Sequence, residues 1–142
     1  MVNGNYYPLM ADYNQWINQG LYTVRAAVSD EQRKSDRGAF FKSMHATLNH
    51  ILWADRAWLA RFRAQTYPQT CMGAEICADF GQLRAEREAM DAFIRQWAGA
   101  LSDDCLQQPL TFTSVTDAKT RSGPACFFVT HRFNHQTHQR GQ

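Results

Sequence analysis

The sequence predicts an all-α protein, a four-helix bundle whose last helix follows a long, partly extended connection. Three observations predict this class. Four segments carry apolar residues at every third or fourth position, a β-branched and aromatic stretch separates the last two segments, and 44% of the 142 residues are hydrophobic. A chain of this length can bury its own core, so we expect one domain over residues 1–142.

Apolar periodicity places the first three helices. The first is expected from about residue 9 to residue 28 and the second from about residue 38 to residue 64, after a loop in which Asp36 caps the second helix. The second helix is apolar nearly all round at its middle, which predicts burial between several neighbours. The third is expected from about residue 74 to residue 101, with the alternating steps of a bundle helix.

Two charged residues interrupt the apolar faces of these helices. Asp55 lies in the apolar stripe of the second helix and Arg87 in that of the third. A charge in an apolar stripe needs a partner, so one hypothesis is an Asp55–Arg87 pair across the two helices. In the alternative, Arg87 reaches the surface along its aliphatic stem.

The connection before the last helix has a different composition. Residues 109–120 are rich in β-branched and aromatic side chains and contain a turn-like Asp117-Ala118-Lys119, which predicts a short hairpin or an extended crossover. Gly123-Pro124 then opens the last helix, with Pro124 expected in its first turn.

Composition excludes several classes of protein. Fifteen basic residues oppose thirteen acidic ones, and a net charge of +2 is too weak a bias for nucleic-acid binding. No apolar run approaches the roughly 18–20 residues that cross a bilayer, and the N-terminus does not resemble a signal peptide. Four cysteines without a C-x-x-C pair are expected to be reduced thiols, which favours a cytoplasmic protein.

The five histidines carry the strongest functional signal. His131, His135 and His138 share one face of the last helix, where imidazoles four residues apart can converge on a divalent ion. His50 is the best further ligand, because small alanines surround it on the second helix; His45 ranks lower. The alternatives are a buried hydrogen-bonded cluster and solvent-facing histidines.

Two long stretches carry a resemblance to a known family: Thr47-Leu-Asn-His-Ile-Leu-Trp-Ala-Asp55-Arg-Ala-Trp58-Leu59 and His131-Arg-Phe-Asn-His-Gln-Thr-His-Gln-Arg-Gly-Gln142. They resemble the DinB family, damage-inducible four-helix-bundle proteins related to thiol-dependent S-transferases. The resemblance extends over nearly the whole chain, including residues 13–18, 36–43 and 83–87.

The resemblance implies a divalent metal, zinc or nickel, held by three histidines. His50 and His135 match two of the positions, but the third is Gln139, whose neutral amide oxygen is a poorer ligand than imidazole. His138 could replace it after a slight rotation of the helix, or His131 could pair with His135. The site is therefore intact with a shifted ligand, weakened or lost.

The chain also ends sooner than is usual in this family. The last helical turn is expected to fray, which would loosen His138 and Gln139 more than His135.

Two functions follow from the resemblance. The first is a metal-dependent thiol transferase or hydrolase that acts on a small molecule with a low-molecular-weight thiol, since three protein ligands leave an open coordination position; no catalytic residue is assigned. The alternative is a non-enzymatic, stress-related helical protein with a degenerate metal site. A homodimer is expected in either case.

Overall fold

The computed structural model describes residues 5–68 and 71–142, which are mainly helical with one small two-stranded sheet. The elements in chain order are α1 (Tyr6–Ala26), α2 (Asp30–Lys34), α3 (Met44–Phe62), α4 (Phe80–Gly99), α5 (Asp103–Gln107), β1 (Pro109–Thr113), β2 (Thr120–Pro124) and α6 (Ala125–Arg140).

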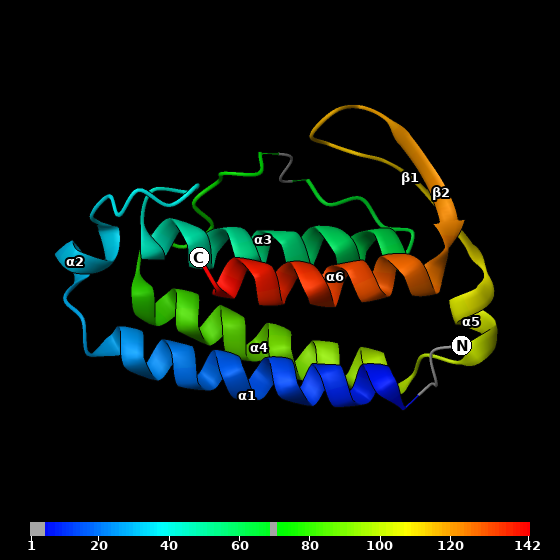
Figure 1. Cartoon of the computed structure of the whole chain (residues 1–142), viewed down its shortest axis with the longest axis horizontal. Coiled ribbons are helices and arrows are strands. Elements are labelled where there is room, and N and C mark those ends of the chain that lie inside the picture. The colour runs from blue at the N-terminus through cyan, green and yellow to red at the C-terminus, as the bar shows by residue number, and fades with distance from the viewer. Residues whose placement is uncertain (1–4, 69–70) are drawn as a thin grey trace.

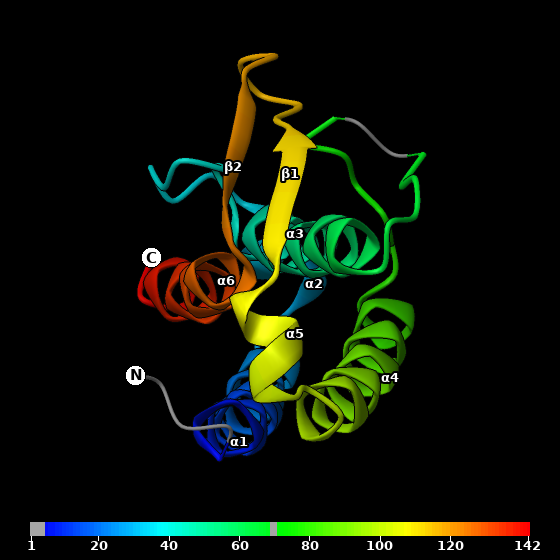
Figure 2. The same ribbon diagram turned by 90° about the vertical axis from the view of Figure 1, so that its right-hand side faces the viewer.

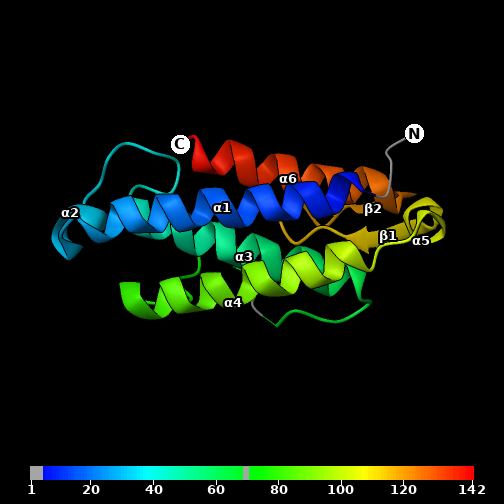
Figure 3. The same cartoon turned by 90° about the horizontal axis from the view of Figure 1, so that it is seen from below.

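The four long helices α1, α3, α4 and α6 run side by side along the molecule (Figure 1). From one end, α3 and α6 form one layer over α1 and α4, and the β1–β2 hairpin rises beyond the α3–α6 layer (Figure 2). From below, α1 runs between α6 and α4 (Figure 3). Contacts join α1 to α4, α4 to α3, α3 to α6 and α6 to α1, so the four helices close a ring around the core.

The core consists of two main apolar clusters between these helices. One contains Leu59 of α3, Ile94 of α4 and Phe133 of α6, each at most 4% exposed. The other lies towards the opposite end of the helices and contains Leu52 and Leu83, both fully buried. In the described part of the chain, no helix combines the length and apolar character needed to cross a membrane.

The sequence places the starts of α3 and α4 too early. α3 begins at Met44, because the Ser43 hydroxyl accepts a hydrogen bond from the Ala46 N–H and caps the helix there. Asp36 does not cap it; its carboxylate accepts from the Gly38 N–H in the preceding turn. The predicted start of α3 at residue 38 is therefore wrong. Apolar residues precede Ser43, but the helix begins only after this cap.

The start of α4 is displaced for a similar reason. Asp79 caps α4, so the helix begins at Phe80 and not at residue 74. Upstream, Asn49 Oδ1 accepts from the N–H groups of Ile76 and Cys77, both at 2.8 Å. These bonds satisfy backbone donors outside any helix.

The short helix α2 lies where a connecting loop was expected, although it carries a local signal. Ser29 and Gln32 form a capping box at its start, with each side chain accepting a backbone N–H of the other residue.

Of the two alternatives for the connection before the last helix, the structure shows the hairpin and not the extended crossover. β1 and β2 pair antiparallel, from Pro109 opposite Pro124 to Thr113 opposite Thr120. Pro124 ends β2 in an extended conformation, and α6 begins one residue later, so Pro124 lies just before the first turn and not within it. α6 is helical through Arg140, and the Gly141 N–H donates to the carbonyls of Thr137 and His138.

The predicted Asp55–Arg87 pair is confirmed, and it belongs to a larger buried network. Arg87 Nη2 donates to Asp55 Oδ2 at 2.7 Å, and Arg132 of α6 donates to Asp55 Oδ1 at 2.6 Å. Arg87 Nη2 also lies 2.7 Å from Asp91 Oδ1, and Asn18 of α1 donates to the Asp91 carboxylate. All five side chains are buried, so the network joins all four long helices.

The arginines set the protonation of Asp55. Burial alone raises the pKa of its carboxyl group, but the charges and hydrogen bonds of Arg132 and Arg87 outweigh burial and hold that pKa below its ordinary value. Asp55 is therefore ionised at neutral pH, and each oxygen of its carboxylate accepts from a different helix.

Replacing Asp55 with Asn should destabilise the fold strongly. The change leaves the buried Arg132 without its counter-charge and Arg87 with Asp91 alone, so we expect the free energy of unfolding to fall by about 3–5 kcal/mol. Urea unfolding followed by circular dichroism measures this. Asp12→Asn is the control: Asp12 pairs with Arg95 at 2.6 Å in an exposed position, and its loss should cost under about 1 kcal/mol. Equal losses in the two variants would contradict the central place of Asp55.

The wild-type protein and Asp55→Asn should differ in how their stability responds to acid. A carboxyl whose folded-state pKa is depressed stabilises the fold fully above its unfolded pKa, about 3.9, and this contribution is lost as the pH falls through the folded-state value. The stability difference between wild type and Asp55→Asn should be constant above about pH 5 and shrink below pH 4. Urea titrations at several pH values test this, and a difference that is undiminished at pH 2 would show that ionised Asp55 is not its source.

Candidate metal centre

A pocket of about 640 Å³ lies between α3, α6 and the hairpin. Its wall combines aromatic side chains, four histidines and two arginines, and no acidic residue of the described chain lines it. The lining residues are Phe40, Phe41, His50, Trp53, Ala54, Trp58, Arg61, Met72, Phe112, Ser114, Val115, Thr116, Arg121, Phe127, Phe128, His131, His135, His138, Gln139 and Gln142.

His50 is buried in α3 and held in one orientation. Its Nδ1 donates to the Met72 carbonyl oxygen at 3.1 Å, because a carbonyl can only accept. The ring also stacks on Phe41, with centroids 4.0 Å apart. The proton therefore sits on Nδ1, and Nε2 carries a lone pair; a backbone carbonyl fixes metal-binding histidines in the same way.

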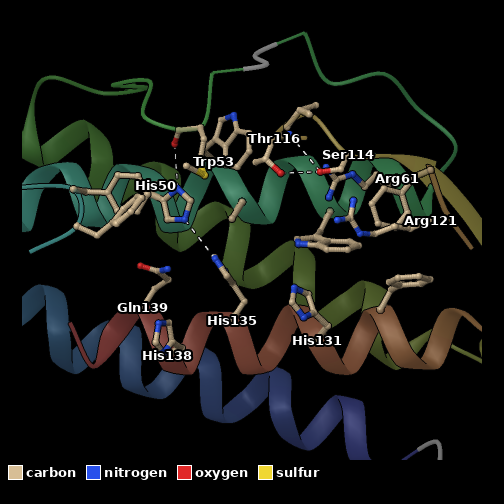
Figure 4. A pocket seen from close by; sticks show the side chains of 18 of the residues that line it. His50, Trp53, Arg61, Ser114, Thr116, Arg121, His131, His135, His138 and Gln139 are labelled. Atoms are coloured by element: carbon tan, nitrogen blue, oxygen red, sulfur yellow. Dashed lines mark hydrogen bonds between the residues drawn. The ribbon is translucent and has the colours of Figure 1, made fainter. Parts of the chain in front are cut away.

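His135 of α6 meets His50 across the pocket. The two Nε2 atoms are 3.4 Å apart, and the dashed line in Figure 4 marks this contact. His135 Nδ1 is buried without a hydrogen-bond partner. The structure thus brings together the two histidines that the sequence ranks first.

Both rings are neutral at physiological pH. Burial, and then the neighbouring His50 and His131, lower the pKa of His135 to about 4. Burial also lowers the pKa of His50 below its ordinary value, although the Met72 carbonyl opposes the shift. Neutral imidazole is the form that binds a metal ion.

Gln139 and His138 differ in their surroundings. Gln139 extends from α6 towards α3, while the His138 ring stays beside the α6 ribbon (Figure 4). Gln139 Oε1 is buried and has no hydrogen-bond partner. His138 is exposed at the edge of the pocket, with its Nε2 3.5 Å from Gln142 Nε2.

The other two histidines lie apart from the facing pair. His131 is exposed, with its ring centroid 6.3 Å from that of His135 and 5.4 Å from that of Trp58. His45 is buried, and its Nε2 lies 2.8 Å from the Cys77 carbonyl oxygen, outside the pocket. Within the described residues, no group of three or more His, Cys, Asp or Glu side chains is placed to hold a metal ion.

A comparison with family models now identifies the chain. The model described as the DinB family matches residues 1–142, the whole of the sequence. The chain belongs to the DinB family. A comparison with curated proteins finds no match. The family resemblance predicted from the sequence is therefore confirmed, and the two stretches that carried it lie face to face in this DinB chain, on α3 and α6.

Sequence reasoning missed the other half of the pocket. Arg61 on α3 and Arg121 on β2 both line it, as do Trp58 and Phe112, which pack at 5.2 Å between ring centroids. The spacing of Trp58 in the apolar stripe of its helix is typical of a core residue, and no local pattern indicates that the hairpin folds over α3. Only the tertiary arrangement of this DinB chain brings these residues beside the histidines.

The donor atoms present allow a test of the metal that the DinB family implies. His50 Nε2 and His135 Nε2 are neutral imidazole nitrogens that face each other, and Gln139 supplies a buried oxygen with no hydrogen-bond partner among the described residues. Two imidazoles and an amide oxygen fit a divalent ion, with fewer strong ligands than three imidazoles would give.

Proposed function

We propose that this DinB-family protein binds a divalent metal, zinc or nickel, through His50, His135 and the amide oxygen of Gln139. The observation that carries the proposal is the 3.4 Å approach of the two Nε2 atoms. Met72 fixes the lone pair of His50 on that side, so the nitrogens are oriented as a pair of ligands would be.

The unpartnered Gln139 oxygen favours a metal site over a simple hydrogen-bonded histidine pair. A buried acceptor without a partner costs about 1–3 kcal/mol, and a coordinated cation would remove that cost. We propose further that the four long helices form the four-helix bundle of the family, with α3 and α6 as the ligand-bearing pair.

The proposed activity is that of a thiol transferase or hydrolase acting on a small molecule. A bound ion would supply Lewis acidity, lowering the pKa of a water or thiol held beside it. The chain's own residues bind and orient the substrate: aromatic rings line the pocket, and the hairpin covers one end of it. A low-molecular-weight thiol partner and a homodimer belong to this proposal.

The second candidate function is a binding protein without catalysis. The presence of Gln139 in place of a third histidine favours this function, because a neutral amide oxygen holds a transition metal less firmly than an imidazole. The two candidates share the pocket and differ in whether the bound metal supports turnover.

Metal analysis of the untagged protein tests the proposed ligands. We expect stoichiometric zinc after loading and dialysis, and its loss in His50→Ala and in His135→Ala, since each change removes one of two imidazoles. His138→Ala is the matched control and should keep the metal, because His138 lies exposed beside the helix. A protein that takes up neither zinc nor nickel contradicts the site, and a loss in His138→Ala as large as in His50→Ala contradicts the choice of Gln139.

Replacing Gln139 with His should strengthen the site. An imidazole in place of the amide oxygen completes the family's three-histidine set, so we expect zinc affinity to rise by at least about tenfold. Competition with a chromogenic chelator measures the affinity, and Gln96→His at an exposed position of α4, away from the histidines, is the control. An unchanged affinity in Gln139→His would show that residue 139 does not reach the ion.

Turnover separates the two candidate functions. The zinc-loaded protein is mixed with a low-molecular-weight thiol and 1-chloro-2,4-dinitrobenzene, and conjugate formation is followed by absorbance. A metal-dependent rate that His135→Ala abolishes supports the enzyme. Bound zinc without a rate above the uncatalysed reaction, for this and for hydrolysable ester substrates, supports the binding protein.

A further inference from the structure

The hairpin end of the pocket carries a positive charge that the described protein leaves without a counter-charge. Arg61 is half-buried on α3, with its guanidinium 4.6 Å from the ring centroids of both Trp58 and Phe112. Among the described residues, the buried Arg87 and Arg132 pair with Asp55, whereas Arg61 forms no ion pair with a carboxylate. A half-buried guanidinium that no carboxylate of the described residues neutralises attracts negative charge, so this end suits an anion.

The surroundings of Arg61 leave its charge unbalanced. Arg121 lines the same end, but its two terminal nitrogens donate to the Asp117 carboxylate at 3.0 and 2.6 Å, in the exposed turn of the hairpin. Burial and the charge of Arg121 lower the pKa of Arg61, which reflects an environment short of negative charge. The hydroxyl groups of Ser114 and Thr116, 2.8 Å apart, also line the pocket and can donate to an acceptor.

The walls next to Arg61 are aromatic. Trp58, Phe112 and Phe128 pack against one another, with centroid separations of 5.1 to 6.0 Å. A flat apolar body would be buried against these rings, whereas a bare inorganic anion would leave them uncovered. A volume of about 640 Å³ is within the usual range for a site that encloses an organic molecule.

We propose that the hairpin end of the pocket is a carboxylate subsite, in which Arg61 binds an aromatic carboxylic acid whose ring lies against Trp58 and Phe112. A planar guanidinium matches a carboxylate through two parallel hydrogen bonds. Figure 4 shows Arg61 and Arg121 together at one end of the pocket and His50 with His135 at the other.

This arrangement also orients the ligand. With its carboxylate at the hairpin end, the opposite end of the molecule points towards the facing histidines. A role for the far end of the ligand beside His50 and His135 rests on the proposed function, whereas the carboxylate subsite itself requires no metal.

Binding of 2-naphthoate to the metal-free full chain tests the subsite. Isothermal titration calorimetry compares it with 2-naphthamide, a neutral molecule of the same shape. Hydrogen bonds to charged groups predict that the acid binds about 10- to 100-fold more tightly than the amide. A preference below threefold, or no binding of either molecule, overturns the proposal.

Variants of Arg61 locate the source of the preference. Arg61→Met keeps an unbranched apolar stem but removes the charged guanidinium, and it should abolish the preference for the acid. Arg61→Lys should retain part of it, because a point charge replaces the planar fork. Arg63→Met is the matched control: Arg63 lies over the Phe93 ring, outside the pocket, and its loss should leave the preference intact. A preference that survives in Arg61→Met overturns the proposal.

The outcome is independent of the metal centre. Because the titration uses metal-free protein, a chain that takes up no zinc but still prefers naphthoate contradicts only the proposed function. A chain that binds zinc without preferring naphthoate contradicts only the carboxylate subsite. Thermal unfolding of each variant, followed by circular dichroism, confirms that the compared proteins are folded.

Discussion

The structure depends on one buried carboxylate. Asp55 on α3 is fully buried, and it accepts hydrogen bonds from Arg87 of α4 and from Arg132 and Gln136 of α6. Apolar side chains can slide against one another at small cost, but a buried ion pair is stable in only one geometry. Asp55 therefore fixes the positions of α4 and α6 along α3, and Asp91 extends the same constraint to α1.

The candidate metal centre inherits its geometry from this network. His50 lies on α3 five positions before Asp55, and His135 lies on α6 between Arg132 and Gln136, both of which bind Asp55. A shift of α6 by one turn would break the buried ion pair and separate the two imidazoles together. The residues that hold the helices in register are thus also the positioning residues of the proposed site.

The pocket has two chemically different ends joined by an aromatic wall. At one end, burial and the proximity of other imidazoles keep His50 and His135 neutral and suited to metal binding. At the other, Arg61 is held against Trp58 and Phe112 without a carboxylate of its own. No acidic side chain of the described residues lines the space between. Such a division orients an elongated ligand, since its polar and apolar parts each have one favourable place.

The sequence by itself predicted the four helical segments and the family, because these depend on periodicity and on two long motifs. It left two alternatives each for the connection before α6 and for Arg87, and only the tertiary structure decided for the hairpin and for the Asp55–Arg87 pair. The local caps Ser43 and Asp79 begin α3 and α4, whereas the path of the chain before α4 depends on Asn49, which accepts from the backbone of Ile76 and Cys77, a long-range contact that periodicity does not reveal. The facing of His50 and His135, the free oxygen of Gln139 and the place of Arg61 under the hairpin were likewise decided only by packing. Each depends on which residues from distant segments share one space, and no local pattern encodes that.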